Sequence, residues 1–467
     1  MSQTLPEKDQ PSSRRVPSVS STDANSRQNP LPQATIRETL QILRDVELPM
    51  IAKGPIIRRP KVVELVARTG WETQAVKRMQ KVADRYGTGP LMLSTPKKMA
   101  MVLDPEHVHR ILDASPEPFA TAETLKRHAL KHFEPKVSLI SHGEERTQRR
   151  QLNEAALDTD HPIHRMAESF MPAVREEAEA LLREVDAKGG TLEYPDFYQA
   201  WFRVVRRVVL GDSHRDDRQI TDLTEKLRGD GNWAFLKPVD KAGRKDLLDQ
   251  IGAALSKAEP GSLAAFMKDM DFGPEDQPAN QVPQWFFAFD PAGMASARSL
   301  ALLAEHPEHM AKAREQIAAE GAETAPMLQH LRGTVLESLR LWATTPMILR
   351  ETTREVEFEH GVMPAGTSVL IFAPFFHRDE RNLDFAHSFS PEIWEEPRTR
   401  DQWPLMPFSA GTAICPGRHL VLLLTSNFLA EIIRAKDVTL TSHSLEPGSM
   451  PGLLNNFTLE FELTSPA

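Results

Sequence analysis

The chain has 467 residues, with 56 Lys or Arg against 65 Asp or Glu, so its formal net charge is −9. With 40% hydrophobic and 26% charged residues it has a globular composition, and it is long enough for one large core. The acidic balance argues against a nucleic-acid or anionic-membrane binder, because there is no excess of cations to displace counterions. No run of about 18 apolar residues occurs, so no membrane anchor is expected.

The first 33 residues are rich in Ser, Pro, Gln, Asn and Arg and hold few large aliphatic side chains. Such a segment buries too little surface to offset the entropy cost of ordering it. We therefore predict a disordered tail over 1–33 and a single domain over 34–467. The start of the chain also lacks the apolar stretch of a secretory signal, which predicts a cytoplasmic protein.

After the tail, apolar residues recur mostly at three- and four-residue spacing, which is typical of amphipathic helices. The pattern predicts helices over 34–43, 61–86, 166–185, 198–209, 283–306, 307–320 and 327–342. Strand signals are few and late. They consist of alternation around 356–358, around 369–371 after a Pro-Ala-Gly turn, and over 457–463. The expected fold class is mainly α with a minor β part, in one large domain.

Cysteine usage is the most restrictive feature of the composition, because Cys415 is the only cysteine. One cysteine excludes an internal disulfide, a zinc finger and an iron–sulfur cluster held by this chain's thiolates alone. A single cysteine is most often a small buried hydrophobic residue. Its sequence surroundings must therefore show whether it has a chemical role.

Those surroundings read Phe408-Ser-Ala-Gly411-Thr-Ala-Ile-Cys415-Pro416-Gly417-Arg418. Apolar residues at four-residue steps downstream predict a buried helix with Pro416 at its first position. A sulfur at a helix N-terminus faces unpaired N–H groups, which predicts a lowered pKa for Cys415. Gly411 and Gly417 permit tight turns and close backbone approach. These features suit a flat apolar cofactor such as haem. The alternative is a Cys–His–Asp nucleophile, but no local protease signature accompanies the cysteine.

The pattern Phe408-x-x-Gly411-x-x-x-Cys415-x-Gly417 resembles the haem-binding loop of the cytochromes P-450. Further landmarks of that family follow in the same order. Glu337-Ser-Leu-Arg340 resembles its Glu-x-x-Arg pair, and residues three apart on a helix share a face. Phe389-Ser-Pro391-Glu392-Ile-Trp394 resembles its Phe-x-Pro-Glu-Arg-Trp segment.

The resemblance implies haem b with Cys415 as the axial ligand of the iron. It places Arg350 beside a haem propionate, and Arg146 and Arg150 where a His-x-x-x-Arg motif supplies further propionate partners. A guanidinium group pairs well with a carboxylate. Four positions match substrate-facing positions of the family: Phe286, Phe287, Thr345 and Met347.

Three positions depart from the family pattern. Ile393 replaces an arginine that usually joins the Glu-x-x-Arg pair, and Ala413 replaces a propionate partner. In the long helix that crosses the haem, Asp290 keeps the acid of the proton relay, whereas Pro291 replaces its threonine. A proline inside a helix costs about 3 kcal/mol and frees the carbonyl four residues earlier, that of Phe287. We therefore expect a kink there and a place for a water molecule.

The function implied by the resemblance is a haem-thiolate monooxygenase, which inserts one oxygen atom from O₂ into a small, largely apolar organic substrate. A monomer served by a separate ferredoxin and ferredoxin reductase is expected, since the chain shows no flavin domain and has one cysteine. The missing threonine leaves open a peroxide-driven peroxygenase or a redox-neutral isomerase or dehydratase. The non-enzymatic alternative is a haem-thiolate sensor.

Overall fold

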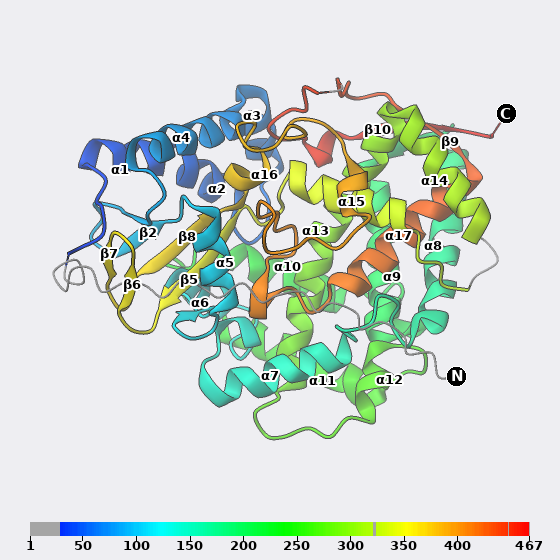
Figure 1. The fold of residues 1–467 in the computed structure, drawn as a ribbon. Coiled ribbons are helices and arrows are strands. Elements are labelled where there is room, and N and C mark those ends of the chain that lie inside the picture. The colour runs from blue at the N-terminus through cyan, green and yellow to red at the C-terminus, as the bar shows by residue number, and fades with distance from the viewer. Residues whose placement is uncertain (1–28, 321–323, 447, 467) are drawn as a thin grey trace, which may run out of the picture.

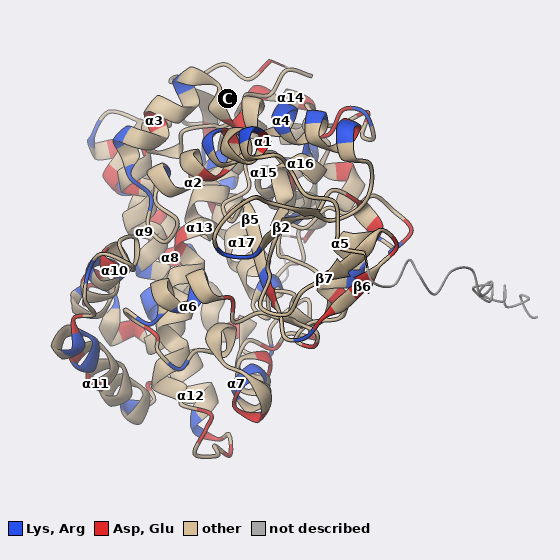
Figure 2. Cartoon of the chain, turned by 90° about the vertical axis from the view of Figure 1, so that its left-hand side faces the viewer, with Lys and Arg blue, Asp and Glu red and all other residues tan. Residues whose placement is uncertain are grey.

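The computed structural model describes residues 29–320, 324–446 and 448–466. Helices make up most of this part of the chain and strands are few, which confirms the predicted fold class (Figure 1). The main sheet and the first helices lie on one side of the molecule, and the long helices lie on the other (Figures 1 and 2).

The main sheet has five strands in the order β1-β2-β8-β5-β3. β2 and β8 pair in parallel, and the other neighbours pair antiparallel. Their bounds are Leu91–Met92 (β1), Met99–Met101 (β2), Phe119–Ala120 (β3), Met347–Thr352 (β5) and Ser368–Phe372 (β8). Every second residue of β5 is buried, so Arg350 shares a buried face with Ile348 and Thr352.

Two smaller sheets complete the β part. One has the order β4-β10-β9 and the other is the hairpin β6-β7. Their bounds are Thr191–Glu193 (β4), Val356–Phe358 (β6), Gly361–Met363 (β7), Asp437–Leu440 (β9) and Glu460–Thr464 (β10).

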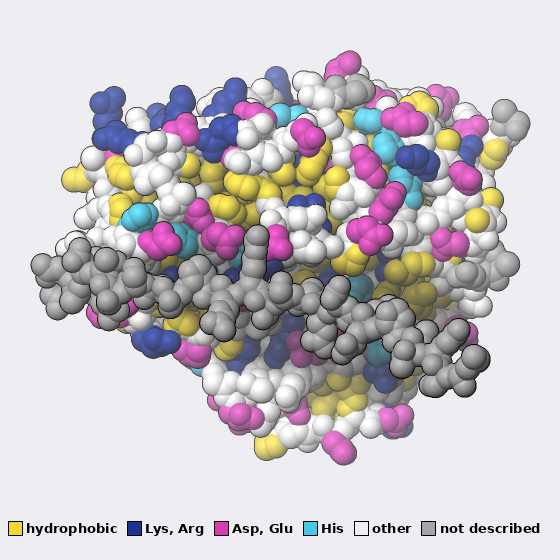
Figure 3. All heavy atoms as spheres, viewed as in Figure 1, with side chains coloured by type: hydrophobic (Ala, Val, Ile, Leu, Met, Phe, Trp, Pro, Cys, Tyr) yellow, Lys and Arg dark blue, Asp and Glu magenta, His cyan; other side chains and the backbone are white. Residues whose placement is uncertain are grey.

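The N-terminal helices are α1 (Ile36–Ile42), α2 (Leu48–Lys53), α3 (Pro60–Thr69) and α4 (Trp71–Tyr86). The single helix predicted over 61–86 is divided in two, because Gly70 takes a left-handed conformation with φ of 64°. α4 turns Lys77, Lys81 and Arg85 to solvent, and basic side chains line the edge formed by α3 and α4 (Figure 3).

The helical body is built around α13 (Pro278–Glu305), which packs against α9, α15 and α17. The helices predicted over 166–185, 198–209, 283–306, 307–320 and 327–342 are all present, within a few residues at their ends. The long helices around α13 are α7 (Gly143–Ala156), α8 (Ala167–Ala187), α9 (Tyr194–Leu210), α10 (Gln219–Gly231), α11 (Lys241–Lys257), α14 (Pro307–Glu320), α15 (Gln329–Leu341) and α17 (Arg418–Ala435). Four short helices are α5 (Pro105–Asp113), α6 (Thr124–Leu130), α12 (Leu263–Lys268) and α16 (Ala373–His377).

The contact between α9 and α13 is close because of one glycine. A Cβ atom at Gly293 would lie 2.7 Å from Cδ1 of Trp201, so a larger residue would displace the indole. Nε1 of Trp201 donates to the carbonyl of Phe289 at 2.8 Å. α13 continues through Pro291 without interruption.

Residues 29–33 belong to the fold, contrary to the predicted tail. The N–H of Met92 donates to the carbonyl of Pro32 at 2.9 Å, and the N–H of Val362 donates to that of Asn29 at 3.0 Å. The rest of the predicted tail lies outside the described residues. Within the described ranges, no helix is long and apolar enough to cross a lipid bilayer.

Candidate functional site

The loop that carries Cys415 is held in shape by its own backbone. The N–H of Cys415 donates to the carbonyl of Phe408 at 2.9 Å, and that of Ile414 donates to the carbonyl of Gly411 at 3.1 Å. Gly411 has φ of 65°, and a Cβ atom there would collide with the carbonyl of Leu112. The predicted tight turn is therefore confirmed at Gly411. The chain also turns at Gly417, where the N–H of Arg418 donates to the carbonyl of Cys415 at 3.4 Å, but the φ of −92° at Gly417 suits any residue.

The helix after the cysteine is present but begins later than predicted. α17 starts at Arg418 with Gly417 as its N-cap, so Pro416 precedes the helix. Burial raises the pKa of the Cys415 thiol, while the N–H of Gly417 and the charges of Arg150 and Arg418 oppose that rise. The prediction of a lowered pKa for Cys415 is therefore wrong when only protein groups surround the thiol. The reason is that apolar surroundings favour its neutral form. A bound metal cation would reverse this balance, since a coordinating thiol is deprotonated.

One face of α13 is open within an otherwise buried helix. From Asn280 to Leu303, all residues are buried except Gln284, Phe287, Ala288 and Pro291. Their three- and four-residue spacing places them on a single face of the helix, which we call the open face. This face is apolar apart from Gln284, whose amide, in the orientation that satisfies both groups, donates to the buried carboxylate of Glu134.

A cluster of three cations lies between α6, α7 and β5, and consists of the half-buried Lys126 and the buried Arg146 and Arg350. Nζ of Lys126 donates only to carbonyl oxygens, those of Thr121 at 2.9 Å and Leu349 at 3.3 Å. Nε of Arg350 donates to Ser115 Oγ at 2.8 Å. Nη1 of Arg350 donates to the Leu349 carbonyl at 3.0 Å, while its buried Nη2 has no partner. Nε of Arg146 donates to Thr121 Oγ1 at 3.3 Å.

This cation cluster has no directly bound carboxylate, and only the more distant charges of Glu123 and Glu154 favour the charged forms of Lys126 and Arg146, respectively. Burial and the neighbouring guanidinium groups lower the pKa of Lys126 to about 7 and that of Arg350 to about 10. Burial also lowers the pKa of Arg146, as does the charge of Arg150. Buried charges are normally paired. Within the described part of the chain, no carboxylate forms an ion pair with any of the three. An anionic ligand fits the cluster, and the propionates of a haem are such groups.

Arg150 is tied to the cysteine loop. Its Nη2 donates to the carbonyl of Ile414 at 2.8 Å, and its Nε donates to Oε1 of Glu154 at 2.6 Å. The side chain therefore braces the loop directly beside Cys415. Its predicted contact with a propionate stays a prediction.

Glu337 and Arg340 are buried together, as predicted. Both side chains are fully inaccessible, and two parallel hydrogen bonds of 2.7 Å join them. The remaining donors of Arg340 reach four backbone carbonyls, those of His377, Phe385, Ala386 and Ser388. The pair thereby fixes α15 to the segment that leads toward the cysteine loop.

Asp290 is buried on a different face of α13 and is held by an arginine that sequence reasoning missed. Nη2 of Arg228 donates to Oδ2 of Asp290 at 2.5 Å and to the carbonyl of Ile56 at 3.1 Å. The guanidinium group also lies 4.6 Å over the ring of Phe287. Arg228 and Lys126 gave no sequence signal, because each lies in a helix with many charged residues and reads as a solvated side chain.

The predicted substrate positions lie on α13 and at the start of β5, and the two on α13 face different sides of that helix. Phe287 is on the open face and meets the ring of Phe133 edge to face at 5.9 Å. Met347 is half-buried at the start of β5, and Thr345 is exposed just before it. Phe286 lines a cleft between α9 and α10 and lies on another face of α13 than Phe287, and its predicted contact with substrate stays a prediction.

Comparisons with known proteins agree with these observations. The family model described as cytochrome P450 matches residues 55–232 and 275–459. Cytochrome P450 93G1 of Oryza sativa subsp. japonica is 30% identical over 300 residues, which is 59% of this chain and 55% of that protein. The cyclooctat-9-en-7-ol 5-monooxygenase of Streptomyces melanosporofaciens is 34% identical over 139 residues, covering 28% of this chain and 30% of that protein.

A further relative is the beta-amyrin 24-hydroxylase of Glycine max, which is 30% identical over 242 residues, or 47% of this chain and 44% of that protein. The matched segments therefore span at most 55% of the length of these three relatives. The family model, in contrast, covers most of the chain and includes both the Glu337–Arg340 pair and the cysteine loop. The chain belongs to the cytochrome P450 family.

Proposed function

We propose that this protein is a haem-thiolate monooxygenase that oxidises a small, largely apolar organic substrate. It would act as a cytoplasmic monomer served by separate electron carriers. The balanced reaction joins a substrate C–H bond with O₂, two electrons and two protons, and yields a hydroxylated product and water. Two of the relatives are named as a monooxygenase and a hydroxylase, which supports oxygen insertion as the class of reaction.

The observation that carries this proposal is the combination of one cysteine on a glycine-shaped loop with three clustered cations, none of which has an ion-pair partner among the described residues. Cys415 would be the axial thiolate, and Lys126, Arg146 and Arg350 would hold the propionates. The cofactor would be haem b, because the chain has no second cysteine that could attach the porphyrin covalently. Bound haem with a thiolate ligand supplies the activation of O₂ and favours cleavage of its O–O bond.

The open face of α13 would form one wall of the substrate site. Phe287, Ala288 and Pro291 offer only carbon surface there, which favours an apolar substrate by removing that surface from water. Phe133 fixes the ring of Phe287, and Met347 would add a flexible apolar contact from β5.

Asp290 would hold the proton that the reaction consumes. Its carboxylate is buried one residue before Pro291 and is kept in place by Arg228. Because Pro291 has no N–H, the carbonyl of Phe287 lacks its normal helical donor. That carbonyl can accept a hydrogen bond from a water molecule at the open face, which would stand in for the missing threonine hydroxyl.

The electrons would come from a ferredoxin and its reductase that use NAD(P)H. With Cys415 as the only cysteine, this chain cannot hold an iron–sulfur cluster on its own thiolates. A separate electron carrier is therefore required by the proposed reaction.

Purified protein and its Cys415→His variant test the ligand and the reaction together. The reduced carbon-monoxide complex should show the red-shifted Soret band of a thiolate ligand, and Cys415→His should abolish the shift. Turnover of an apolar substrate panel with NADPH and a surrogate ferredoxin system should exceed turnover with peroxide alone. Faster turnover with peroxide alone than with NADPH would instead favour the peroxygenase. Conversion of substrate with neither oxidant nor reductant would favour the isomerase or dehydratase.

A further inference from the structure

A cleft of about 270 Å³ lies between α9 and α10, and neither Cys415 nor the cation cluster contributes to its lining. Along α9 it is lined by Tyr198, Phe202 and Arg206, which share one face of that helix at four-residue spacing. The rise of an α-helix places the first and last of these about 12 Å apart. Phe286 of α13 adds to the lining, and the facing wall comes from α10. The cleft therefore has the size of a site for a small ligand.

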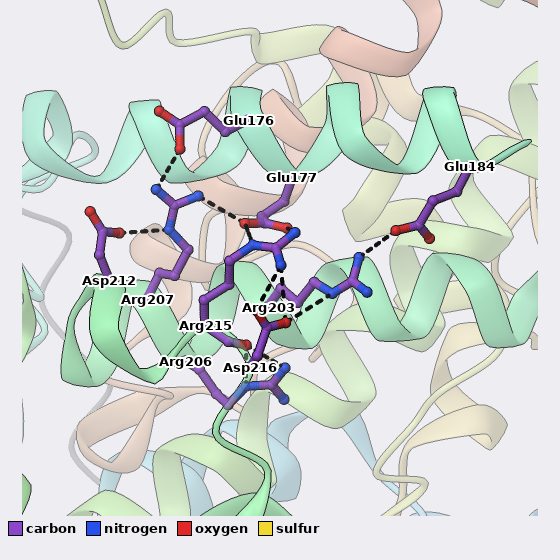
Figure 4. Close-up of polar contacts among 9 residues, drawn as sticks. All are labelled: Glu176, Glu177, Glu184, Arg203, Arg206, Arg207, Asp212, Arg215 and Asp216. Atoms are coloured by element: carbon purple, nitrogen blue, oxygen red, sulfur yellow. Dashed lines mark hydrogen bonds and ion pairs between the residues drawn. The ribbon is translucent and has the colours of Figure 1, made fainter. Parts of the chain in front are cut away.

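Arg206 is buried in the wall of this cleft without a carboxylate partner. It is 6% exposed, and its Nε and Nη2 both donate to the carbonyl of Arg215, at 2.8 and 2.7 Å. The other arginines of the same polar network, Arg203, Arg207 and Arg215, each pair with at least one carboxylate (Figure 4). Arg206 forms no ion pair with any residue that the structure describes. A guanidinium group has more N–H donors than one carbonyl accepts, so Arg206 can still bind an anion from the cleft.

The charges around Arg206 leave it without a close counterion. Burial lowers the pKa of Arg206, and the charges of Arg218 and Arg203 lower it further. Asp216 and Asp222 oppose the change, but both carboxylates are exposed and each already pairs with another arginine. Interactions of exposed charges are weak, because water and salt screen them. An anion in the cleft would meet Arg206 where water is largely excluded, so the attraction would be stronger there than at the surface.

The other end of the cleft offers apolar surface. The rings of Tyr198 and Phe202 lie 4.6 Å apart, and Phe286 lines the same cleft from α13. The charges of Arg228 and Glu225 act on the pKa of Tyr198, so both lie at this end. Arg228 is already bound to a carboxylate of α13 at 2.5 Å, and Glu225 is exposed. A ligand with an anionic group at one end and an apolar body at the other matches this arrangement.

We propose that this cleft is a second ligand site, which takes a small organic acid with its carboxylate on Arg206 and its apolar body against Tyr198 and Phe286. A carboxylate suits the planar guanidinium group, because it can bind that group through parallel hydrogen bonds. Phe286 and Phe287 lie on different faces of α13, so the helix separates the acid from the open face. The proposal goes beyond the monooxygenase function, because binding of the acid requires neither oxygen chemistry nor a substrate.

Isothermal titration calorimetry of the haem-loaded protein with phenylbutyrate tests this site. The titration is run with excess imidazole on the haem iron, which blocks binding beside the haem. We expect Arg206→Gln to bind phenylbutyrate about tenfold more weakly, as the loss of a hydrogen bond to a charged group predicts. The neutral analogue phenylbutyramide should bind the wild type no better than phenylbutyrate binds Arg206→Gln. Arg218→Gln removes an exposed arginine of the same lining and should match the wild type.

A second variant keeps the proposal testable if Arg206→Gln does not fold. Gln199→Trp leaves Arg206 in place and fills the cleft from an exposed position of α9, so it should abolish binding. No binding of phenylbutyrate to the imidazole-saturated wild type would overturn the proposal, and so would unchanged affinity in Gln199→Trp. Because the titration needs no turnover, a protein that binds phenylbutyrate through Arg206 but oxidises no substrate would sink only the monooxygenase function.

Discussion

The indole N–H of Trp394 donates to Oε1 of Glu337 at 2.8 Å, at the place where Ile393 leaves the family's usual arginine missing. The N–H of Ser390 donates to Oε2 of the same carboxylate at 3.0 Å. Together with the two bonds from Arg340, these contacts satisfy a fully buried carboxylate without a second arginine. The buried ion pair therefore has the complete set of hydrogen bonds that such a pair needs.

Loss of one partner from this pair should be severe. Glu337→Ala leaves the Arg340 charge buried, at a cost of about 3–5 kcal/mol, so we expect little soluble haem-loaded protein. Trp394→Phe removes one hydrogen bond to a charged group and should cost about 1.5–3 kcal/mol in denaturant unfolding. Glu392→Gln, an exposed change in the same segment, is the control. Normal haem content in Glu337→Ala would contradict the structural role.

Lys126 should contribute to the retention of haem. Lys126→Met removes a cation that has no ion-pair partner of its own, so haem transfer from the holoprotein to apomyoglobin should be about tenfold faster, equivalent to roughly 1.4 kcal/mol. Lys126→Arg should release haem more slowly than Lys126→Met, because it keeps the charge. Lys136→Met changes an exposed lysine nearby on the chain and should behave as the wild type. Equal release rates for all four proteins would exclude a propionate contact.

The retention of haem should also depend on pH. With no anion bound, the pKa of Lys126 is about 7, so above that pH its amine is neutral and must take up a proton to pair with a propionate, while Arg350 keeps its charge. Haem affinity should therefore weaken as the pH rises from 7 toward 9. Release rates measured across this range should lose that trend in Lys126→Met. A trend that persists in the variant would assign it to another group.

Asp290 should matter for chemistry driven by O₂ and not for haem binding. Asp290→Asn keeps the shape of the side chain but removes the acid, so NADPH-driven turnover should fall by about 10²–10⁴. The spectrum of the carbon-monoxide complex should not change. Intact turnover in Asp290→Asn would end the relay hypothesis and favour the peroxygenase or rearrangement alternatives.

Pro291→Thr tests the role of the free carbonyl of Phe287. The new N–H would form the helical bond to that carbonyl, which displaces the proposed water molecule. We expect less product per NADPH consumed, although the variant regains a hydroxyl at the family position. Product yield equal to or above that of the wild type would mean that the proline is only tolerated.

Several helices of this fold could be predicted from the local sequence pattern alone, whereas other elements could not. The helices over 167–187, 307–320 and 329–341 were predictable because apolar residues recur at helical spacing. The strand that carries Arg350 was not, because β5 mixes apolar and charged residues and is defined by its pairing with β8. The break at Gly70 escaped the periodicity because a left-handed glycine leaves the apolar spacing on both sides intact.

The sequence by itself located the cysteine loop and the Glu337–Arg340 pair, because each is a short motif that resembles one of the family, and the same resemblance singled out the acid at position 290. Only the tertiary structure decided which charged side chains are removed from solvent. Lys126 meets Arg350, and Arg228 meets Asp290, across long stretches of chain. A charged side chain on a helix reads the same in sequence whether it is solvated or buried. The cost of burying a charge, and hence its role, arises only when the fold removes the solvent around it.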